Sequence, residues 1–310
     1  MATTQPDPAE VVISARGVGK SYDDRPVLAG LDLEITKGEI FALLGPNGAG
    51  KTTTVEILEG YRRADAGELH VLGRDPVDGG ADFRSRIGIV LQHTTAFEQS
   101  TVAETVDMFA VLYPDPMAVA DAVDLVDLTP QADQLAANLS GGQRRRMEVA
   151  CGLVGRPEVL FLDEPTTGLD PEARRRMWEI IAAVKDHGTT VLLTTHYLDE
   201  AEALADRIGI LLGGRLQEVA DPTRIGGRSE ALATVRFVPP GEADSIVIST
   251  EQPATVVADL LARHGELPEL TVTRPSLEDI YLELIARWNA EQLDPANPQR
   301  LDPTQIEVQS

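Results

Sequence analysis

The sequence has little cysteine and no long hydrophobic run. Its single cysteine, Cys151, excludes an internal disulfide and cannot by itself build a structural zinc site. No segment reaches the ~18 to 20 uncharged apolar residues of a membrane-spanning helix, and residues 1–10 are polar rather than typical of a signal peptide. We therefore expect a cytosolic protein.

Basic residues are also scarce. The chain has 27 Lys and Arg against 50 Asp and Glu, a net charge of −23, which repels phosphate backbones and disfavours a protein whose main partner is nucleic acid. Acidic residues exceed basic ones both before and after residue 225, so the charge indicates a dispersed acidic surface rather than an acidic tail. The chain has only four lysines, which makes the position of Lys51 worth attention.

What the chain does contain is enough apolar sequence, 43% of 310 residues, for one α/β core and a small second unit. Short apolar runs predict strands, several of them buried on both faces, at Val11–Ala15, Leu31–Ile35, Ile40–Leu44, Val159–Leu162 and Val191–Leu193. Helical patterns alternate with them, at Thr52–Glu59, Val102–Tyr113, Pro116–Val126, Gly142–Val154, Glu172–Lys185 and Leu198–Ala205. This alternation predicts a parallel sheet covered by helices.

The alternation of strand-like and helix-like segments ends near Asp221, where Pro222, Gly226 and Gly227 predict a linker. Residues 226–291 then predict a small α+β domain of strand, helix, strand and helix, at Ala233–Val238, Thr255–Arg263, Leu270–Thr273 and Leu277–Trp288. The ends of the chain, a loose arm at 1–10 and a proline-bearing tail at 292–310, lack apolar periodicity, so we expect both to be disordered.

A phosphate-binding loop directly follows the strand predicted at Ile40–Leu44. Two glycines four residues apart precede a lysine and a hydroxyl residue in the string Gly45, Pro46, Asn47, Gly48, Ala49, Gly50, Lys51, Thr52, Thr53. The backbone N–H groups of such a loop and the start of the following helix bind phosphate, Lys51 is expected to pair with the β and γ phosphates, and Thr52 is expected to ligate Mg²⁺. The motif indicates a nucleoside triphosphate but not what its energy is used for.

Two adjacent carboxylates end another apolar strand. Asp163 and Glu164 follow the run Val159–Leu162, and strand alternation points their side chains in different directions. Asp163 is suited to hold Mg²⁺ through a water, and Glu164 to accept a proton from an attacking water. The pair predicts phosphoryl transfer rather than binding alone.

The string Leu139 to Gln143 predicts a second anion-binding helix start. Ser140 is a good N-cap, Gly141 and Gly142 expose backbone donors, and Gln143 completes the string, but the segment has no lysine of its own. One complete and one partial phosphate site in one chain favour a head-to-tail dimer in which this segment closes over the nucleotide of the other copy.

Together these motifs resemble the ATP-binding-cassette (ABC) ATPases, over about residues 11–225. The resemblance implies a P-loop NTPase fold with an antiparallel β subdomain and a helical subdomain at about 93–155. It also implies roles for four further residues: Tyr22 stacks on adenine, Gln92 reaches Mg²⁺ and the attacking water, Asp170 crosses the dimer interface and His196 contacts the γ phosphate.

More narrowly, Thr194–Glu202 and Pro275–Tyr281 resemble bacterial drug-export ATPases of the daunorubicin-resistance type. The resemblance implies ATP and Mg²⁺ as ligands, a cassette homodimer or heterodimer, and separate membrane permease subunits at the cytoplasmic face of the membrane, bound in part through His93–Val106. Drug, antibiotic or lipid-like molecules would be the exported substrates.

Alternatives from other classes remain. An importer subunit would carry the same catalytic motifs. A soluble ABC ATPase that acts on DNA or ribosomes is a second alternative. DNA-repair members of the family have a long coiled coil between the P-loop and the segment that corresponds to Leu139–Gln143, whereas only 86 residues separate Thr53 from Leu139 here. Translation factors of the family carry two cassettes in one chain, whereas this chain has one. A cassette that binds ATP without hydrolysing it would usually lack Glu164 or His196, and both are present.

Overall fold

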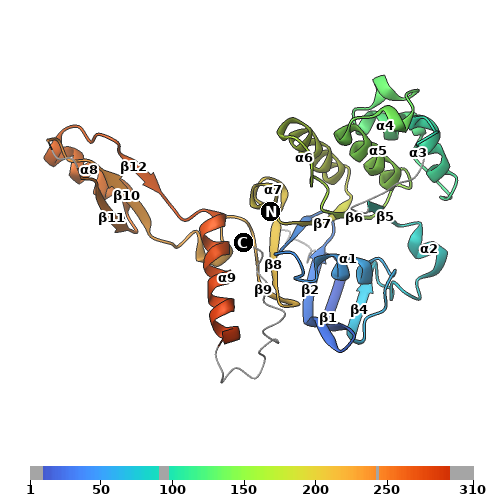
Figure 1. Cartoon of the computed structure of the whole chain (residues 1–310), viewed down its shortest axis with the longest axis horizontal. Coiled ribbons are helices and arrows are strands. Elements are labelled where there is room, and N and C mark those ends of the chain that lie inside the picture. The colour runs from blue at the N-terminus through green and yellow to red at the C-terminus, as the bar shows by residue number, and fades with distance from the viewer. Residues whose placement is uncertain (1–9, 91–97, 242–243, 294–310) are drawn as a thin grey trace, which may run out of the picture. The chain divides into compact units, whose positions relative to one another are not determined.

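The computed structural model describes residues 10–90, 98–241 and 244–293. The chain divides into two compact units, residues 1–219 and 220–310 (Figure 1), and each is described by itself. The predicted arm at 1–10, apart from Glu10, and the predicted tail from 294 onward lie outside the described residues. Residues 292 and 293, which we assigned to the tail, belong to the last helix instead.

The first unit is built on a six-stranded sheet. Its strand order is β5 (Ile87–Val90), β6 (Val159–Asp163), β7 (Thr190–Thr195), β3 (Ile40–Leu44), β8 (Arg207–Leu212) and β9 (Arg215–Ala220). The strands from β5 to β8 run parallel, and every residue of β3, β6 and β7 is buried. The continuous apolar runs of the sequence are therefore confirmed as strands covered on both faces.

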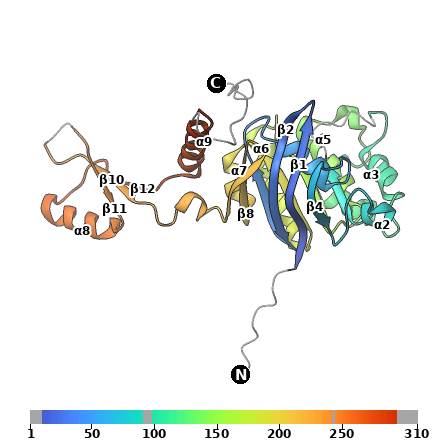
Figure 2. The ribbon, with the colours of Figure 1, turned by 90° about the horizontal axis from the view of Figure 1, so that it is seen from below.

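A second, antiparallel sheet contains β2 (Arg25–Thr36), β1 (Val11–Tyr22) and β4 (Ala66–Val71), which Figure 2 shows side by side. The predicted strands in β1 and β2 stop short of the observed ones because register shifts after Ala15 interrupt the alternation of buried and exposed residues. At this irregularity the N–H of Gly17 donates to Asp32 Oδ1 at 2.8 Å, which lets the pairing continue to Tyr22.

Helices complete the first unit. They are α1 (Lys51–Leu58), α2 (Gly80–Arg84), α3 (Val102–Ala110), α4 (Val119–Leu125), α5 (Gly141–Leu153), α6 (Pro171–Asp186) and α7 (Leu198–Leu204), with 3₁₀ turns at Thr129–Gln131 and Ala136–Asn138. Helices α3, α4 and α5 pack on one another within the helical subdomain predicted at about 93–155. Residues 93–97, which begin both this range and the predicted permease contact His93–Val106, lie outside the described residues. Capping boxes begin two of them, at Thr101 with Glu104 and at Ser140 with Gln143.

The second unit is a small α+β fold. It contains β10 (Ala233–Phe237), β11 (Ile246–Thr250), β12 (Thr271–Thr273), α8 (Pro253–His264), α9 (Leu277–Leu293) and a 3₁₀ turn at Ile225–Gly227. Its sheet has the order β11-β10-β12, and Val235, Phe237, Leu260 and Leu267 form the core between this sheet and α8. The sequence did not predict β11, an edge strand without a buried residue.

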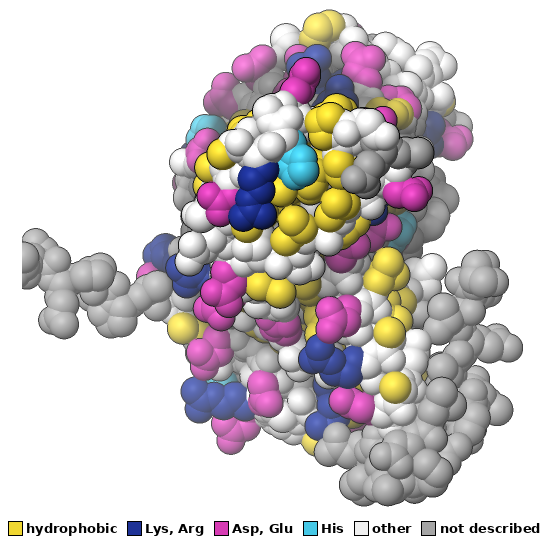
Figure 3. Space-filling view, turned by 90° about the vertical axis from the view of Figure 1, so that its left-hand side faces the viewer, with side chains coloured by type: hydrophobic (Ala, Val, Ile, Leu, Met, Phe, Trp, Pro, Cys, Tyr) yellow, Lys and Arg dark blue, Asp and Glu magenta, His cyan; other side chains and the backbone are white. Residues whose placement is uncertain are grey.

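The acidic surplus is spread over the surface. Figure 3 shows acidic side chains in magenta at many separate places on one face, with basic and hydrophobic side chains between them. This distribution agrees with the dispersed charge that the sequence indicates. Among the described residues, no helix combines the length and the apolar character needed to cross a lipid bilayer.

Candidate functional site

The phosphate-binding loop connects β3 to α1, as predicted. Gly50 has a φ of 105°, a left-handed conformation that glycine adopts without steric cost. At Gly45 a Cβ atom would lie 2.5 Å from the carbonyl oxygen of Leu211, so only glycine fits there. These constraints bring the start of α1 and the loop backbone around one point, where phosphate oxygens can be bound by N–H groups.

The Lys51 side chain lies inside this loop. Its ammonium group donates to the carbonyl oxygens of Gly45 at 2.8 Å and Pro46 at 3.2 Å and lies 3.6 Å from Glu164 Oε1. Burial lowers the pKa of Lys51 below its usual value, and the charges of Glu164 and Asp163 partly offset that effect. The lysine is thus a buried cation at the place where the sequence predicts the phosphates.

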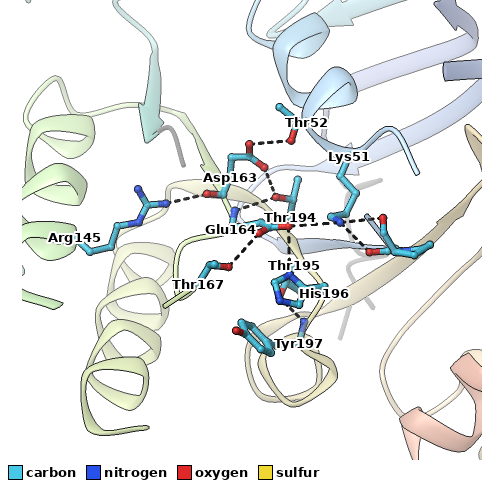
Figure 4. A network of polar contacts seen from close by, with 12 residues as sticks. Lys51, Thr52, Arg145, Asp163, Glu164, Thr167, Thr194, Thr195, His196 and Tyr197 are labelled. Carbon is cyan, nitrogen blue, oxygen red and sulfur yellow. Dashed lines mark hydrogen bonds and ion pairs between the residues drawn. The ribbon is translucent and has the colours of Figure 1, made fainter. Parts of the chain in front are cut away.

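Asp163 ends β6 beside the loop (Figure 4). Its Oδ2 accepts a hydrogen bond from Thr52 Oγ1 at 3.1 Å, and its Oδ1 accepts one from Thr194 Oγ1 at 2.5 Å. Thr52 and Asp163, predicted independently as Mg²⁺ ligands, therefore lie in direct contact. Hydroxyl and carboxylate oxygens suit this ion, which usually takes one or two protein ligands together with phosphate and water, so the pair fits Mg²⁺.

Glu164 lies at the centre of a polar network (Figure 4). Its Oε1 is 3.3 Å from His196 Nδ1, and its Oε2 accepts a hydrogen bond from Thr167 Oγ1 at 3.1 Å. Burial raises the pKa of Glu164, but the charge of Lys51 and the contacts with His196 and Thr167 outweigh it, so the pKa lies below its usual value. Glu164 is therefore an ionised carboxylate at neutral pH, able to accept a proton.

The backbone holds Glu164 in place as well. Its φ of 46° is unusual for a residue with a side chain, and its N–H donates to the carbonyl oxygen and the hydroxyl of Thr194. His196, two residues after Thr194, lies just beyond the end of β7. The two neighbouring strand ends thus aim the acid and the histidine at each other.

A second group of predicted residues lies at the starts of α5 and α6. Ser140 caps α5, and Asp170 caps α6 by accepting from the N–H groups of Glu172 and Ala173. Ser140, Gly142, Gln143 and Asp170 line one open pocket of about 200 Å³, together with Asp127, Arg146, Glu172, Ala173 and Arg176. Gly141 begins α5 beside them. Most of the residues expected to act on a partner's nucleotide are therefore gathered around one open pocket, whose charged lining is three carboxylates and two arginines.

Two predicted residues stand apart from both groups. Tyr22 ends β1, where the Arg62 guanidinium carbon lies 5.2 Å from its ring centroid and the Lys20 ammonium 5.7 Å. Gln92 lies outside the described residues, so its placement stays a prediction.

The sequence did not predict three residues that shape the network. Thr194 pairs with Asp163 in the β6–β7 register and contacts both carboxylate residues, while Thr167 contacts Glu164. Arg145 in α5 donates to the carbonyl oxygens of Asp163 at 2.9 Å and Pro165 at 3.1 Å. Thr194 is identified only by the pairing register of β6 and β7, which cannot be read from the sequence.

Comparison with known proteins decides the family. A family model described as "ABC transporter" matches residues 28–167. The daunorubicin resistance ATP-binding protein DrrA3 of Streptomyces coeruleorubidus is 36% identical over 307 residues, covering 89% of this chain and 96% of the relative. The chain belongs to the ABC family of ATP-binding proteins.

Similarity to other ABC proteins supports the same family assignment. The Nod factor export ATP-binding protein I of Sinorhizobium fredii is 36% identical over 300 residues, covering 90% of this chain and 87% of the relative. A solved structure of cbiO1 from Clostridium perfringens, part of the ABC transporter complex cbiONQ, is 27% identical, with a TM-score of 0.65 over 71% of this chain and 92% of that chain. The chain is an ABC ATPase, with the cassette fold that the sequence predicts.

Proposed function

We propose that this ABC ATPase powers export of a drug, antibiotic or lipid-like molecule through separate membrane permease subunits, at the cytoplasmic face of the membrane. The observation that carries the catalytic part is the contact of Lys51, Glu164 and His196 in one network beside Asp163. Such convergence is what γ-phosphate transfer to water requires.

The geometry supports a division of work within the network. Lys51 binds the β and γ phosphates, the carboxylate of Glu164 takes a proton from the attacking water, and His196 contacts the γ phosphate while its ring is held against Glu164. Thr52 and Asp163 hold Mg²⁺, which when bound neutralises charge on the phosphate oxygens. Tyr22 provides the face on which adenine stacks, and Gln92 orients the attacking water.

The assembly we propose is a head-to-tail dimer of cassettes. Each copy contributes Ser140, Gly141, Gly142, Gln143 and Asp170 to the nucleotide bound at the other copy's Lys51. The open pocket around Ser140 and Asp170 supports this arrangement, because Ser140 and Gly142 at the start of α5 line it. ATP then stabilises the closed pair, and hydrolysis lets it reopen.

The direction of transport rests on relatives. Proteins named for daunorubicin resistance and Nod factor export align with about nine-tenths of this chain, including its second unit. An importer subunit would share the catalytic network, but no described feature favours it.

The proposal is tested by measuring how much of a fluorescent anthracycline accumulates in cells. The cells are those of the source organism from which the gene for this chain has been deleted. Cells that regain the wild-type chain should retain less drug than cells that receive Glu164→Gln, because only the former can hydrolyse ATP. Equal retention in both strains, with both chains present at the membrane, would contradict drug export.

A further inference from the structure

A buried carboxylate outside the catalytic network lies in α7, shortly after His196. Glu200, in the first turn of α7, is completely buried. Its Oε1 accepts a hydrogen bond from Trp178 Nε1 of α6 at 3.2 Å, whereas its Oε2 is buried and has no hydrogen-bond partner among the described residues. Buried carboxylate oxygens without a partner are rare and call for an explanation.

A matching donor is buried nearby. The hydroxyl of Thr166 has no hydrogen-bond partner among the described residues either, and this residue is completely buried. Burial raises the pKa of Glu200, and the adjacent hydroxyls of Thr195 and Thr166 and the Trp178 indole partly offset that effect. The hydroxyls of Thr166 and Thr195 thus lie near the Glu200 carboxylate, and the Thr166 hydroxyl and Glu200 Oε2 are both without a hydrogen bond of good geometry among the described residues.

The two hydroxyls near Glu200 belong to different catalytic segments. Thr166 follows Glu164 by two residues and begins the loop that leads to Asp170 and α6. Thr195 directly precedes His196, and its hydroxyl accepts from the N–H of Tyr197 at 2.9 Å. The Tyr197 ring lies 4.1 Å from that of His196 and 4.3 Å from the guanidinium carbon of Arg174 in α6.

We propose that Glu200 is a positioning residue that couples the loop after Glu164 to the His196 turn. When ATP closes the site, the Thr166 hydroxyl donates to Glu200 Oε2, so that the loop 165–170 and the turn 195–197 are held in one relative position. The inference rests on the proposed roles of Glu164 and His196.

Such a bond affects turnover more than binding. An interaction made only in the closed state stabilises that state and the hydrolytic transition state relative to the open ATP complex, whereas it adds little to the initial binding of ATP to the open site. A merely structural carboxylate would instead hold α6 and α7 together equally with and without nucleotide, and its loss would change stability rather than kcat alone.

Kinetics of the full-length chain test the coupling. Glu200→Gln and Thr166→Val should each lower kcat about tenfold, and the double variant should be no slower than either single one, because both remove the same bond. The KM for ATP should change less than about twofold. Glu39→Gln is the matched control: Glu39 is also buried and hydrogen-bonded, to Thr36 and Arg207, and its variant should keep wild-type kcat.

Fluorescence reports the bond directly, because the chain has only two tryptophans. In a Trp288→Phe background, Trp178 is the only emitter, and ATP should change its emission. The added Thr166→Val substitution should abolish that change. This readout also decides the case if Glu200→Gln fails to fold.

Any of three results would overturn the coupling. The first is an unchanged kcat in both single variants, and the second is a loss of kcat in the double variant that equals the product of the two single losses. The third is an ATP-induced change in Trp178 emission that survives Thr166→Val. Glu164→Gln separates this result from the proposed function. If Glu164→Gln is inactive while the Glu200 and Thr166 variants are normal, only the coupling fails; if Glu164→Gln hydrolyses ATP normally, the proposed catalytic role fails.

Discussion

At the scale of single residues, we propose that Glu164 is the group on which turnover depends. Its carboxylate lies among Lys51, Thr167 and His196, and its pKa is held below the usual value. We expect Glu164→Gln to lower kcat by about 10²- to 10⁴-fold while ATP binding persists, because the amide keeps the shape but cannot take a proton.

Steady-state hydrolysis and ATP titration of the purified chain measure the two effects. Glu158→Gln is the matched control, since Glu158 precedes the same strand at its opposite end and pairs with Arg86. Turnover by Glu164→Gln at the wild-type rate would show that another group accepts the proton.

A second residue-scale prediction concerns Glu59, which is 7% exposed at the end of α1. Burial and the charges of Asp163 and Glu56 raise its pKa from 4.5 to about 8. Folding therefore takes up a proton between these pH values, and the stability contributed by the neutral form is lost as pH rises through this window. Glu59→Gln, which cannot ionise, should stabilise the chain at pH 8 relative to pH 5 by on the order of 1 kcal/mol or more.

Thermal unfolding at the two pH values measures this difference. Glu68→Gln, at an exposed position of β4, should show no such pH-dependent gain. Equal effects of Glu59→Gln at pH 5 and pH 8 would mean that Glu59 is ionised in the folded chain at both.

The sequence predicts the candidate catalytic residues but not all of the residues that position them. Lys51, Thr52, Asp163 and Glu164 each follow a buried apolar strand within a recognisable motif, so the sequence suffices to select them. Thr194 contributes through cross-strand register, which depends on tertiary pairing and leaves no local pattern.

At the scale of elements, Arg145 ties α5 to the acidic end of β6. Its guanidinium donates to two carbonyl oxygens there and to Glu148 at 2.8 Å. Because removing it leaves these buried acceptors without their donor, Arg145→Ala should destabilise the first unit by about 2 to 4 kcal/mol.

Denaturant unfolding of the full chain measures the loss in the transition of the larger unit. Arg144→Ala is the control, because Arg144 is a third exposed and its ion pair with Glu98 spans 3.9 Å, which predicts a loss below about 1 kcal/mol. Similar losses for both variants would show that the contact of Arg145 with the β6 loop carries no special weight.

Elements buried on two faces are the ones that the sequence predicts well. β3, β6 and β7 are continuous apolar runs, whereas β11 and β4 are short, largely exposed strands defined by their neighbours. The predicted linker near Asp221 is also more ordered than its glycines indicate: Ile225 is fully buried, and Arg228 donates to the Pro222 and Pro275 carbonyls. Long-range contacts, not local pattern, fix these segments.

At the scale of the whole molecule, we propose that the chain carries two incomplete halves of a nucleotide site. Lys51 and Glu164 belong to one, and the pocket around Ser140 and Asp170 to the other. In a head-to-tail dimer with two-fold symmetry, each active site takes one half from each copy. A chain damaged in one half can therefore be rescued by a chain damaged in the other.

Mixing variants tests this arrangement. Lys51→Ala and Ser140→Arg should each be inactive alone, because both sites of each homodimer are damaged. In an equal mixture, half of the dimers contain one chain of each kind, and one of their two sites joins an intact Lys51 to an intact Ser140. Hydrolysis should therefore recover to about one quarter of the wild-type rate if dimers form at random and the sites act independently. A double Lys51→Ala, Ser140→Arg chain mixed with Lys51→Ala is the control, because no intact pair can form. Recovery no greater in the test mixture than in this control would exclude sites shared between copies.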